Sequence, residues 1–241
     1  MIELRKLTKA FGSKAALRGI DLRVAPGESL VIFGPNGAGK TTLIRILASL
    51  SRPTGGKVFI GGLDLATHAD GIRRYLGVVS HAPLLYDSLT AEENLRFFAR
   101  LYNLPAAGPR IAELLAQVGL IARRNDLVRT FSRGMVQRLA IARALRHDPQ
   151  VLLLDETDTG LDPQAAEMLH GLLAQLSRAV ASDPAAGRTI VTVTHSIERG
   201  LALADRAVIL AGGRIVFEGT TQGLTPANFR PLYDRYVGGG R

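Results

Sequence analysis

The chain has 241 residues, of which 46% are apolar, so it can bury the core of one large domain or of a domain with an added subdomain. It contains no cysteine, which excludes disulfides, thiol catalysis and cysteine-bound metals. The formal net charge is +9. Because the arginines are spread along the chain, we interpret this charge as solvated surface and expect no nucleic-acid partner.

The apolar runs of the sequence are short. The run from Val151 to Leu154 is typical of them, whereas a helix that crosses a bilayer needs about 20 apolar residues. The first ten residues also lack the basic-then-apolar pattern of a secretion signal. We therefore expect a protein that is cytosolic or that lies on the cytosolic face of a membrane.

The first elements along the chain are predicted strands. Apolar side chains alternate with charged ones at the start, and turn residues at Phe11–Ser13 and Pro26–Gly27 separate the runs. A buried strand then leads into a glycine-rich loop, which is followed by apolar residues at helical spacing. The predicted elements are strands at residues 2–7, 16–24 and 30–33 and a helix at residues 41–50.

Further apolar runs predict a mainly parallel sheet. They lie at residues 78–79, 151–154, 190–193 and 208–210, with helical patterns between them. Buried strands that alternate with helices are typical of an α/β domain. We expect this core to span residues 1–82 and 148–220, with an antiparallel β region at its N-terminal end.

The segment between the two core parts has a different pattern. Thr90 and Glu93 have the spacing of a capping box, and apolar residues follow at helical spacing near 95–101, 111–118 and 136–145. No strand pattern interrupts them. We therefore predict an inserted helical subdomain at residues 83–147 and a C-terminal tail at 221–241, in which Leu232, Tyr233, Tyr236 and Val237 form a short packing helix.

A phosphate-binding loop begins where the strand at 30–33 ends. The residues Gly34-Pro35-Asn36-Gly37-Ala38-Gly39-Lys40-Thr41 match G-x-x-x-x-G-K-[ST], with Thr42 next in the helix. The glycines let backbone N–H groups approach phosphate oxygens, and the helix directs its positive end to the same point. Lys40 can neutralise the β- and γ-phosphates, and the Thr41 hydroxyl can bind Mg²⁺. The loop alone fits kinases, GTPases and recombinases equally well.

Two carboxylates and a histidine follow later strands. Asp155 and Glu156 end the strand at 151–154, and His195 follows the strand at 189–194. Because the carboxyl ends of parallel strands share one edge of the sheet, we expect these side chains beside the phosphate loop. Asp155 is then a candidate for Mg²⁺ binding, and Glu156 for polarising the attacking water. His195 is a candidate hydrogen-bond donor to the γ-phosphate.

The segment from Thr130 to Leu139, with sequence TFSRGMVQRL, resembles the signature motif of ATP-binding-cassette (ABC) proteins. It lies upstream of Asp155 and opens a helix, as in that family. Residues 158–162 resemble the family's D-loop and Thr194-His195 its switch histidine, while Phe11 matches the aromatic position that stacks on adenine. The resemblance covers about residues 2–219 and keeps the family's motif order.

The resemblance implies a mechanism. Two nucleotide-binding domains pair head to tail, and ATP lies between the phosphate loop of one and the signature of the other. Ser132 and the Gly134 N–H then contact the γ-phosphate across the interface, and Asp162 of the D-loop lies close by. ATP favours the closed dimer because it contacts both halves there.

Some positions depart from the family's usual pattern. His81 replaces a glutamine that contacts Mg²⁺ and the γ-phosphate, and we expect it to keep that sensing role. Arg133 and Met135 replace a glycine and a glutamine of the signature, and Thr157 replaces a proline. The chemical set of Lys40, Asp155, Glu156 and His195 is complete, which indicates an active ATPase.

The resemblance also implies separate membrane chains, since this chain has no spanning segment of its own. The stretch 79–95 would carry the coupling surface. Together with the signature and residues 198–206, it looks like the ATPase of the haem exporter of cytochrome c maturation. Similar signatures occur in exporters of drugs, polysaccharides or lipids. A soluble ABC protein that acts on ribosomes or DNA, or an ATP sensor without turnover, are the alternatives from other classes.

Overall fold

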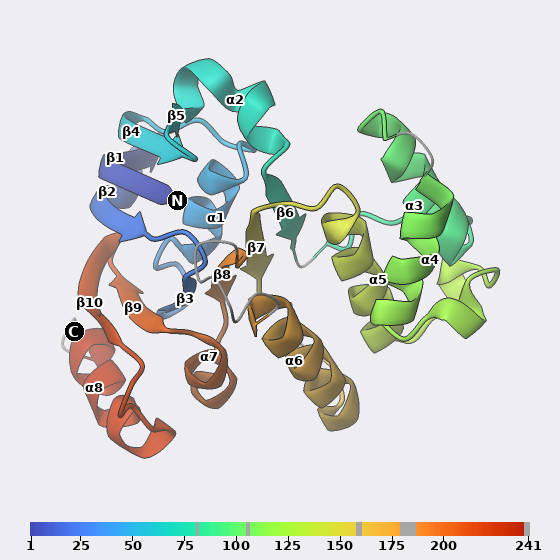
Figure 1. Ribbon diagram of the computed structural model, residues 1–241. Coiled ribbons are helices and arrows are strands. Elements are labelled where there is room, and N and C mark those ends of the chain that lie inside the picture. The colour runs from blue at the N-terminus through green and yellow to red at the C-terminus, as the bar shows by residue number, and fades with distance from the viewer. Residues whose placement is uncertain (81, 105–106, 158–160, 179–186, 239–241) are drawn as a thin grey trace.

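A computed structural model describes residues 1–80, 82–104, 107–157, 161–178 and 187–238. Its described part contains a four-stranded sheet, a six-stranded sheet and helices that surround the second sheet. Figure 1 shows a second, helical lobe beside the sheets. This arrangement confirms the predicted α/β fold with a mainly parallel sheet and an antiparallel N-terminal region.

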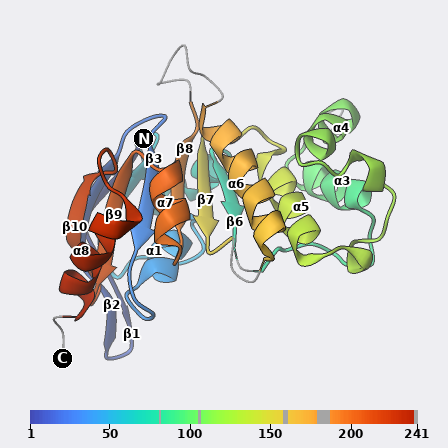
Figure 2. The same cartoon turned by 90° about the horizontal axis from the view of Figure 1, so that it is seen from below.

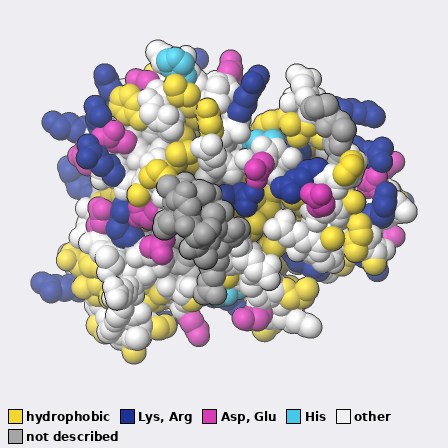
Figure 3. Space-filling view, viewed as in Figure 1, with side chains coloured by type: hydrophobic (Ala, Val, Ile, Leu, Met, Phe, Trp, Pro, Cys, Tyr) yellow, Lys and Arg dark blue, Asp and Glu magenta, His cyan; other side chains and the backbone are white. Residues whose placement is uncertain are grey.

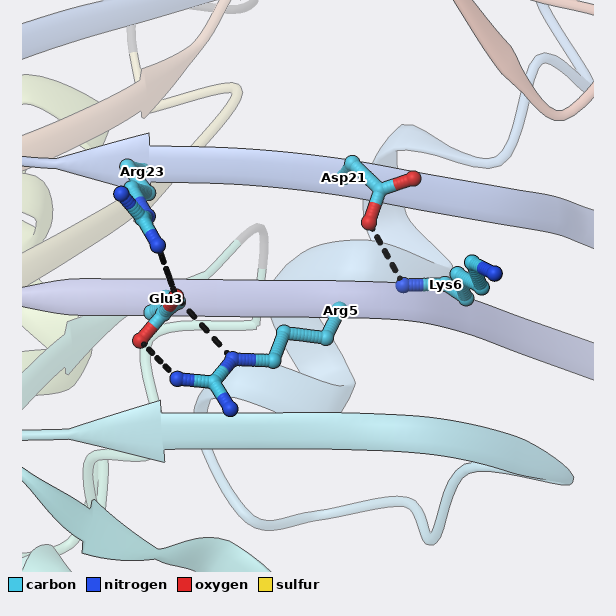
Figure 4. Close-up of polar contacts among 5 residues, drawn as sticks. All are labelled: Glu3, Arg5, Lys6, Asp21 and Arg23. Atoms are coloured by element: carbon cyan, nitrogen blue, oxygen red, sulfur yellow. Dashed lines mark hydrogen bonds and ion pairs between the residues drawn. The ribbon is translucent and has the colours of Figure 1, made fainter.

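The smaller sheet is antiparallel and has the order β2-β1-β4-β5. Its strands are β1 (Ile2–Phe11), β2 (Lys14–Val24), β4 (Gly55–Ile60) and β5 (Leu63–Asp64). The pairing of β1 with β2 shifts register between Leu4 and Leu7, where Lys6 has a φ of 47°. Asp21 on β2 accepts a hydrogen bond from the Lys6 N–H at 2.8 Å, which supplies a partner to the amide at this bulge (Figure 4).

An exposed ion-pair group lies next to the bulge. Glu3 on β1 accepts hydrogen bonds from the guanidinium groups of Arg5 and Arg23, as Figure 4 shows. These contacts, that of Arg5 first, lower the pKa of the Glu3 carboxyl to about 2. The group joins two neighbouring strands on their solvent side.

The larger sheet has the order β10-β9-β3-β8-β7-β6. Neighbouring strands are parallel from β9 to β6, and β10 is antiparallel to β9. The strands are β3 (Ser29–Phe33), β6 (Leu76–Val79), β7 (Val151–Asp155), β8 (Thr189–Val193), β9 (Arg206–Ala211) and β10 (Arg214–Thr220). Every residue of β3 and β7 is buried, which explains the continuous apolar runs in the sequence.

Helices cover both faces of the larger sheet. One core cluster joins α1 (Lys40–Leu47) to both sheets, and α2 (Leu65–Arg73) packs near their edge. The opposite face carries α6 (Pro163–Arg178) and α7 (Ile197–Leu203). Beside α7 lies α8 (Pro226–Gly238), so the predicted packing helix of the tail exists and is longer than expected (Figure 2).

The helical lobe consists of α3 (Ala91–Leu101), α4 (Ala107–Gln117) and α5 (Arg133–Leu145). Two short 3₁₀ turns, Ile121–Arg123 and Val128–Thr130, precede α5. The predicted capping box is present at the start of α3. The Thr90 hydroxyl accepts from the Glu93 N–H at 3.2 Å, and the Glu93 carboxylate accepts from the Thr90 N–H at 2.8 Å.

Some elements differ from the sequence-based expectation. The helix predicted at 41–50 ends at Leu47, because the chain turns at Ser49, whose φ is 57°. The strands β4 and β10 were not predicted. Their alternation is weak because β4 begins with two glycines and β10 has no fully buried position. Pairing with the distant β1 and the adjacent β9, respectively, fixes them as strands.

Basic side chains are spread over the visible face of the molecule (Figure 3). Lysine and arginine side chains lie around the outline of both lobes, and several form ion pairs with acidic neighbours. This distribution agrees with the interpretation of the +9 charge as solvated surface. Among the residues described, no helix is long and apolar enough to span a membrane.

The capping box yields a stability prediction. We expect Thr90→Ala to lower the free energy of unfolding by about 1 kcal/mol, because the first turn of α3 loses its side-chain cap. Urea unfolding followed by circular dichroism measures this change. Ser88→Ala is the control, since Ser88 is exposed and its side chain forms no hydrogen bond with the described residues. Equal stabilities of the two variants would contradict the prediction.

Candidate active site

The candidate site lies at the carboxyl ends of β3, β7 and β8, which are neighbours in the sheet. The phosphate loop follows β3, Asp155 ends β7 with Glu156 next, and His195 follows β8. The expected placement of these residues at one edge is therefore observed. Contacts of 2.7 to 3.5 Å across this edge join residues that lie at or just beyond the ends of different strands.

Close backbone contacts force glycine at two positions of the phosphate loop. A Cβ at Gly34 would lie 2.1 Å from the carbonyl oxygen of Leu210, and one at Gly39 would lie 2.6 Å from that of Ala16. Gly37 needs glycine for a different reason: its φ is 79°, although a Cβ added there would meet no atom within 4 Å. The strand-to-helix turn is thus fixed by backbone packing as well as by its sequence.

Lys40 is 5% exposed and stands at the first position of α1. Its ammonium donates to the carbonyl oxygens of Gly34 at 2.8 Å and Pro35 at 3.0 Å, so its position inside the loop is fixed. Burial lowers the pKa of this ammonium, while the nearby charges of Glu156 and Asp155 act to raise it. The loop therefore holds a positive charge next to the position that phosphate oxygens would take.

The N-terminal end of α1 is open to an anion. Its cap residue is Gly39, which has no capping side chain, and no acidic residue stands in its first turn. The first amides of a helix have no acceptor inside it, and the helix dipole adds positive potential there. The end of α1 therefore fits a phosphate group, as the sequence predicts.

Two oxygen atoms suitable for a divalent cation lie beside this end. The Thr41 hydroxyl donates to a carboxylate oxygen of Asp155 at 3.5 Å, and Asp155 is 6% exposed. A hydroxyl and a carboxylate are the ligand types that Mg²⁺ takes in nucleotide sites. Two members of the metal set predicted from the sequence, Thr41 and Asp155, are thus brought together and fit Mg²⁺, while the third, His81, lies outside the described residues. Among the described residues, no group of three or more His, Cys, Asp or Glu side chains forms a separate metal site.

Glu156 and His195 form a direct contact. The distance from Nε2 of His195 to a carboxylate oxygen of Glu156 is 2.7 Å. Glu156 has a φ of 52°, the left-handed region that non-glycine residues rarely adopt, and its N–H donates to the carbonyl of Val193 at 2.9 Å. Such backbone strain at the end of a strand aims the side chain into the site and is typical of functional positions.

The remaining predicted residues lie farther from this cluster. Phe11 is 56% exposed at the end of β1, with the Lys9 ammonium 4.8 Å from its ring centre. Ser132 caps α5 and accepts from the Met135 N–H at 3.3 Å. Asp162 caps the start of α6 by accepting from Ala165 N–H at 2.9 Å. None of the described contacts joins Ser132 to the phosphate loop within one chain.

Gly134 has a packing role. A Cβ at this position would lie 2.6 Å from the Cβ of Ala165, so the start of α5 contacts the start of α6. Asn36 and Ala38 lie in the phosphate loop, and Thr42 lies in the first turn of α1. Their role in ATP binding stays a prediction. His81 and residues 158–160 lie outside the described residues.

The sequence did not predict that α8 reaches this site. A cavity of about 210 Å³ lies between the two, bordered by Gly34, Thr194 and His195 from the core and by Arg230, Tyr233 and Asp234 from α8. The i, i+3, i+4 spacing of these three α8 residues is a signal for one shared helix face. Their contact with the site depends on long-range packing, which that spacing does not specify.

Comparison with known proteins identifies the family. The family model described as ABC transporter matches residues 17–159, which include the phosphate loop, the signature and both carboxylates. This chain belongs to the ABC transporter family. It is an ABC ATPase that binds ATP.

Similar proteins come from bacterial transporters. The chain is 39% identical to the daunorubicin resistance ATP-binding protein DrrA3 of Streptomyces coeruleorubidus, over 90% of this chain and 67% of that protein. It is 36% identical to the ABC transporter ATP-binding protein NatA of Bacillus subtilis, over 93% of this chain and 91% of NatA.

A dimeric, post-hydrolysis structure of the ATP-binding cassette MJ0796, bound to ADP and Pi, is also similar. Its TM-score is 0.80 and its sequence identity 30%, over 93% of this chain and all of that one.

The phosphate loop yields a binding prediction. We expect Gly34→Ala to weaken the binding of a fluorescent ATP analogue at least about tenfold, or 1.4 kcal/mol, because the added methyl group displaces the loop from Leu210. Gly61→Ala is the matched control: Gly61 also has a positive φ, of 59°, but nothing lies within 4 Å of its added Cβ. Wild-type affinity in Gly34→Ala would refute the packing argument.

Proposed function

We propose that this chain is the ATP-binding and ATP-hydrolysing subunit of a membrane ABC transporter and that it dimerises on ATP to drive separate transmembrane subunits. The observation that carries the catalytic part is the 2.7 Å contact between His195 and Glu156 at the edge that holds the phosphate loop. It joins a candidate base and a hydrogen-bonding histidine from neighbouring strands.

Each catalytic side chain has a specific task in this proposal. Glu156 accepts a proton from the attacking water as the water oxygen bonds to the γ-phosphorus, and the bond from that phosphorus to the β,γ-bridging oxygen breaks to release ADP. Lys40 binds the β- and γ-phosphate oxygens, in exchange for its present carbonyl partners Gly34 and Pro35. His195 donates to a γ-phosphate oxygen, which requires it to leave the carboxylate of Glu156. Before ATP binds, the contact with His195 then keeps the carboxylate of Glu156 occupied.

The cofactor in this proposal is ATP with Mg²⁺. The loop residues 34–42 hold the phosphates, and the exposed Phe11 ring supplies a stacking surface for adenine. Thr41 and Asp155 would hold Mg²⁺, directly or through water. When bound, the ion neutralises negative charge on the phosphate oxygens.

Ser132 and Gly134 act across a dimer interface in this proposal. Ser132 is exposed at the N-terminal end of α5, which contains no acidic residue in its first turn. That end offers a hydroxyl, the N-terminal amides of a helix and positive potential to an anion. Since these groups do not contact the loop of their own chain, we infer that they contact ATP bound to a second copy. Asp162 would lie at the same interface.

The cargo is assigned by similarity alone. DrrA3, at 39% identity, is named for daunorubicin resistance, which favours an exporter of drug-like compounds among the exporters considered. Haem export for cytochrome c maturation stays a prediction from the sequence pattern. In either case the permease chains are separate partners, and the subunit lies on the cytosolic face through them.

Copurification tests the transporter assignment most directly. The chain should copurify with transmembrane permease chains, and candidate cargo should stimulate ATP hydrolysis of the complex in lipid vesicles. Daunorubicin-like and haem cargo can be compared in the same vesicles. Copurification with ribosomes or DNA instead would refute the assignment, and salt titration would identify such binding as electrostatic.

The catalytic assignment yields a further prediction. We expect Glu156→Gln to bind ATP with unchanged affinity, to form a stable ATP-bound dimer and to lower kcat about 100-fold or more, because the amide cannot accept the proton. Glu198→Gln, an exposed residue on α7, is the control and should keep wild-type turnover. Normal turnover by Glu156→Gln would remove Glu156 from the role of base.

A further inference from the structure

One aromatic ring connects α8 to the phosphate loop. Phe229 of α8 is fully buried, and its ring centre lies 5.1 Å from that of Phe33, the residue immediately before Gly34. A capping pair fixes the start of α8: Thr225 N–H donates to Asn228 at 2.7 Å, and Asn228 N–H donates back to the Thr225 hydroxyl. The helix therefore stands in a defined position against the strand that carries the loop.

The same ring also contacts the helix that follows His195. A Cβ at Gly200 of α7 would lie 2.6 Å from Cζ of Phe33, so α7 packs closely on this ring. The Phe33 ring thus lies between α7 and α8. Because β8, His195 and α7 follow one another along the chain, the position of α7 determines the position of the His195 backbone.

The cavity beside His195 has α8 as one of its walls. Its volume of about 210 Å³ has room for several water molecules. Tyr233 is partly buried in its wall, and burial, followed by the charge of Asp234, raises the pKa of the tyrosine. Arg230 borders the same cavity and forms no ion pair with the described residues.

We propose that Tyr233 and Arg230 are positioning residues for ATP hydrolysis: α8 braces Phe33 and supplies one wall of the cavity beside His195, and both features hold His195 relative to the phosphate loop. This inference rests on the proposed function of His195. It gives the C-terminal helix, which lies outside the family match at 17–159, a task in turnover. Neither residue contacts ATP in this account; both act through the position of His195.

The test compares variants of α8 in the full chain. Tyr233→Ala should lower kcat about tenfold, because a catalytic group that moves by a fraction of an ångström loses rate. The KM for ATP should stay within about twofold, because the phosphate loop is unchanged. Tyr233→Phe should restore kcat, because its ring still forms that part of the cavity wall. Thermal unfolding of each variant confirms that the chain is folded.

Two arginines on the same helix provide the matched pair. Arg230→Ala should lower kcat, whereas Arg235→Ala should not, since both side chains are exposed but only Arg230 borders the cavity. Equal kcat values in Tyr233→Ala, Arg230→Ala and Arg235→Ala would overturn the inference, as would a failure of Tyr233→Phe to restore kcat. If the wild-type chain itself showed no ATPase activity, that result would instead refute the proposed function.

Discussion

The burial of one lysine ammonium constrains the whole site. Lys40 is 5% exposed, and a buried charge is costly unless polar groups surround it. Carbonyl groups of Gly34 and Pro35 provide this environment, with Asp155 and Glu156 close enough to act on its pKa. The loop can bend around the ammonium only because Gly34 and Gly39 allow backbone contacts that a side chain would block. The tight loop, the parallel sheet edge and the acidic neighbours thus depend on one another.

The same edge explains how distant sequence segments form one site. Strands β3, β7 and β8 are neighbours, so their carboxyl ends bring together residues near positions 34, 155 and 195. The His195–Glu156 contact and the left-handed backbone of Glu156 place the candidate base under local restraint. Packing of Phe33 between α7 and α8 extends this restraint to the C-terminal helix. We infer that ATP turnover depends both on the strand ends that form the site and on the packing of α7 and α8 that supports them.

The sequence predicted the local parts of this arrangement well. The loop at 34–41 and the acids at the end of β7 follow from motifs within a few residues, and the Thr90 capping box follows from one helical turn. The strand β4 was missed because its pairing with the distant β1 defines it, and β10 was missed because it has no fully buried position that would give a local alternation. The left-handed φ of Glu156 and the contact between residues 33 and 229 were not predictable because local motifs do not specify them. Tertiary packing determines both.

In the proposed dimer, ATP joins the phosphate loop of one copy to the signature of another. Because the chain has no cysteine, Asn36→Cys and Ser132→Cys together introduce thiols without background, and both positions are exposed. Oxidation of the doubly substituted chain should give a disulfide-linked dimer on a non-reducing gel with ATP present, and little without it. Each single substitution serves as a control. A dimer band that is independent of ATP, or none in the doubly substituted chain when it has bound ATP, would contradict the account.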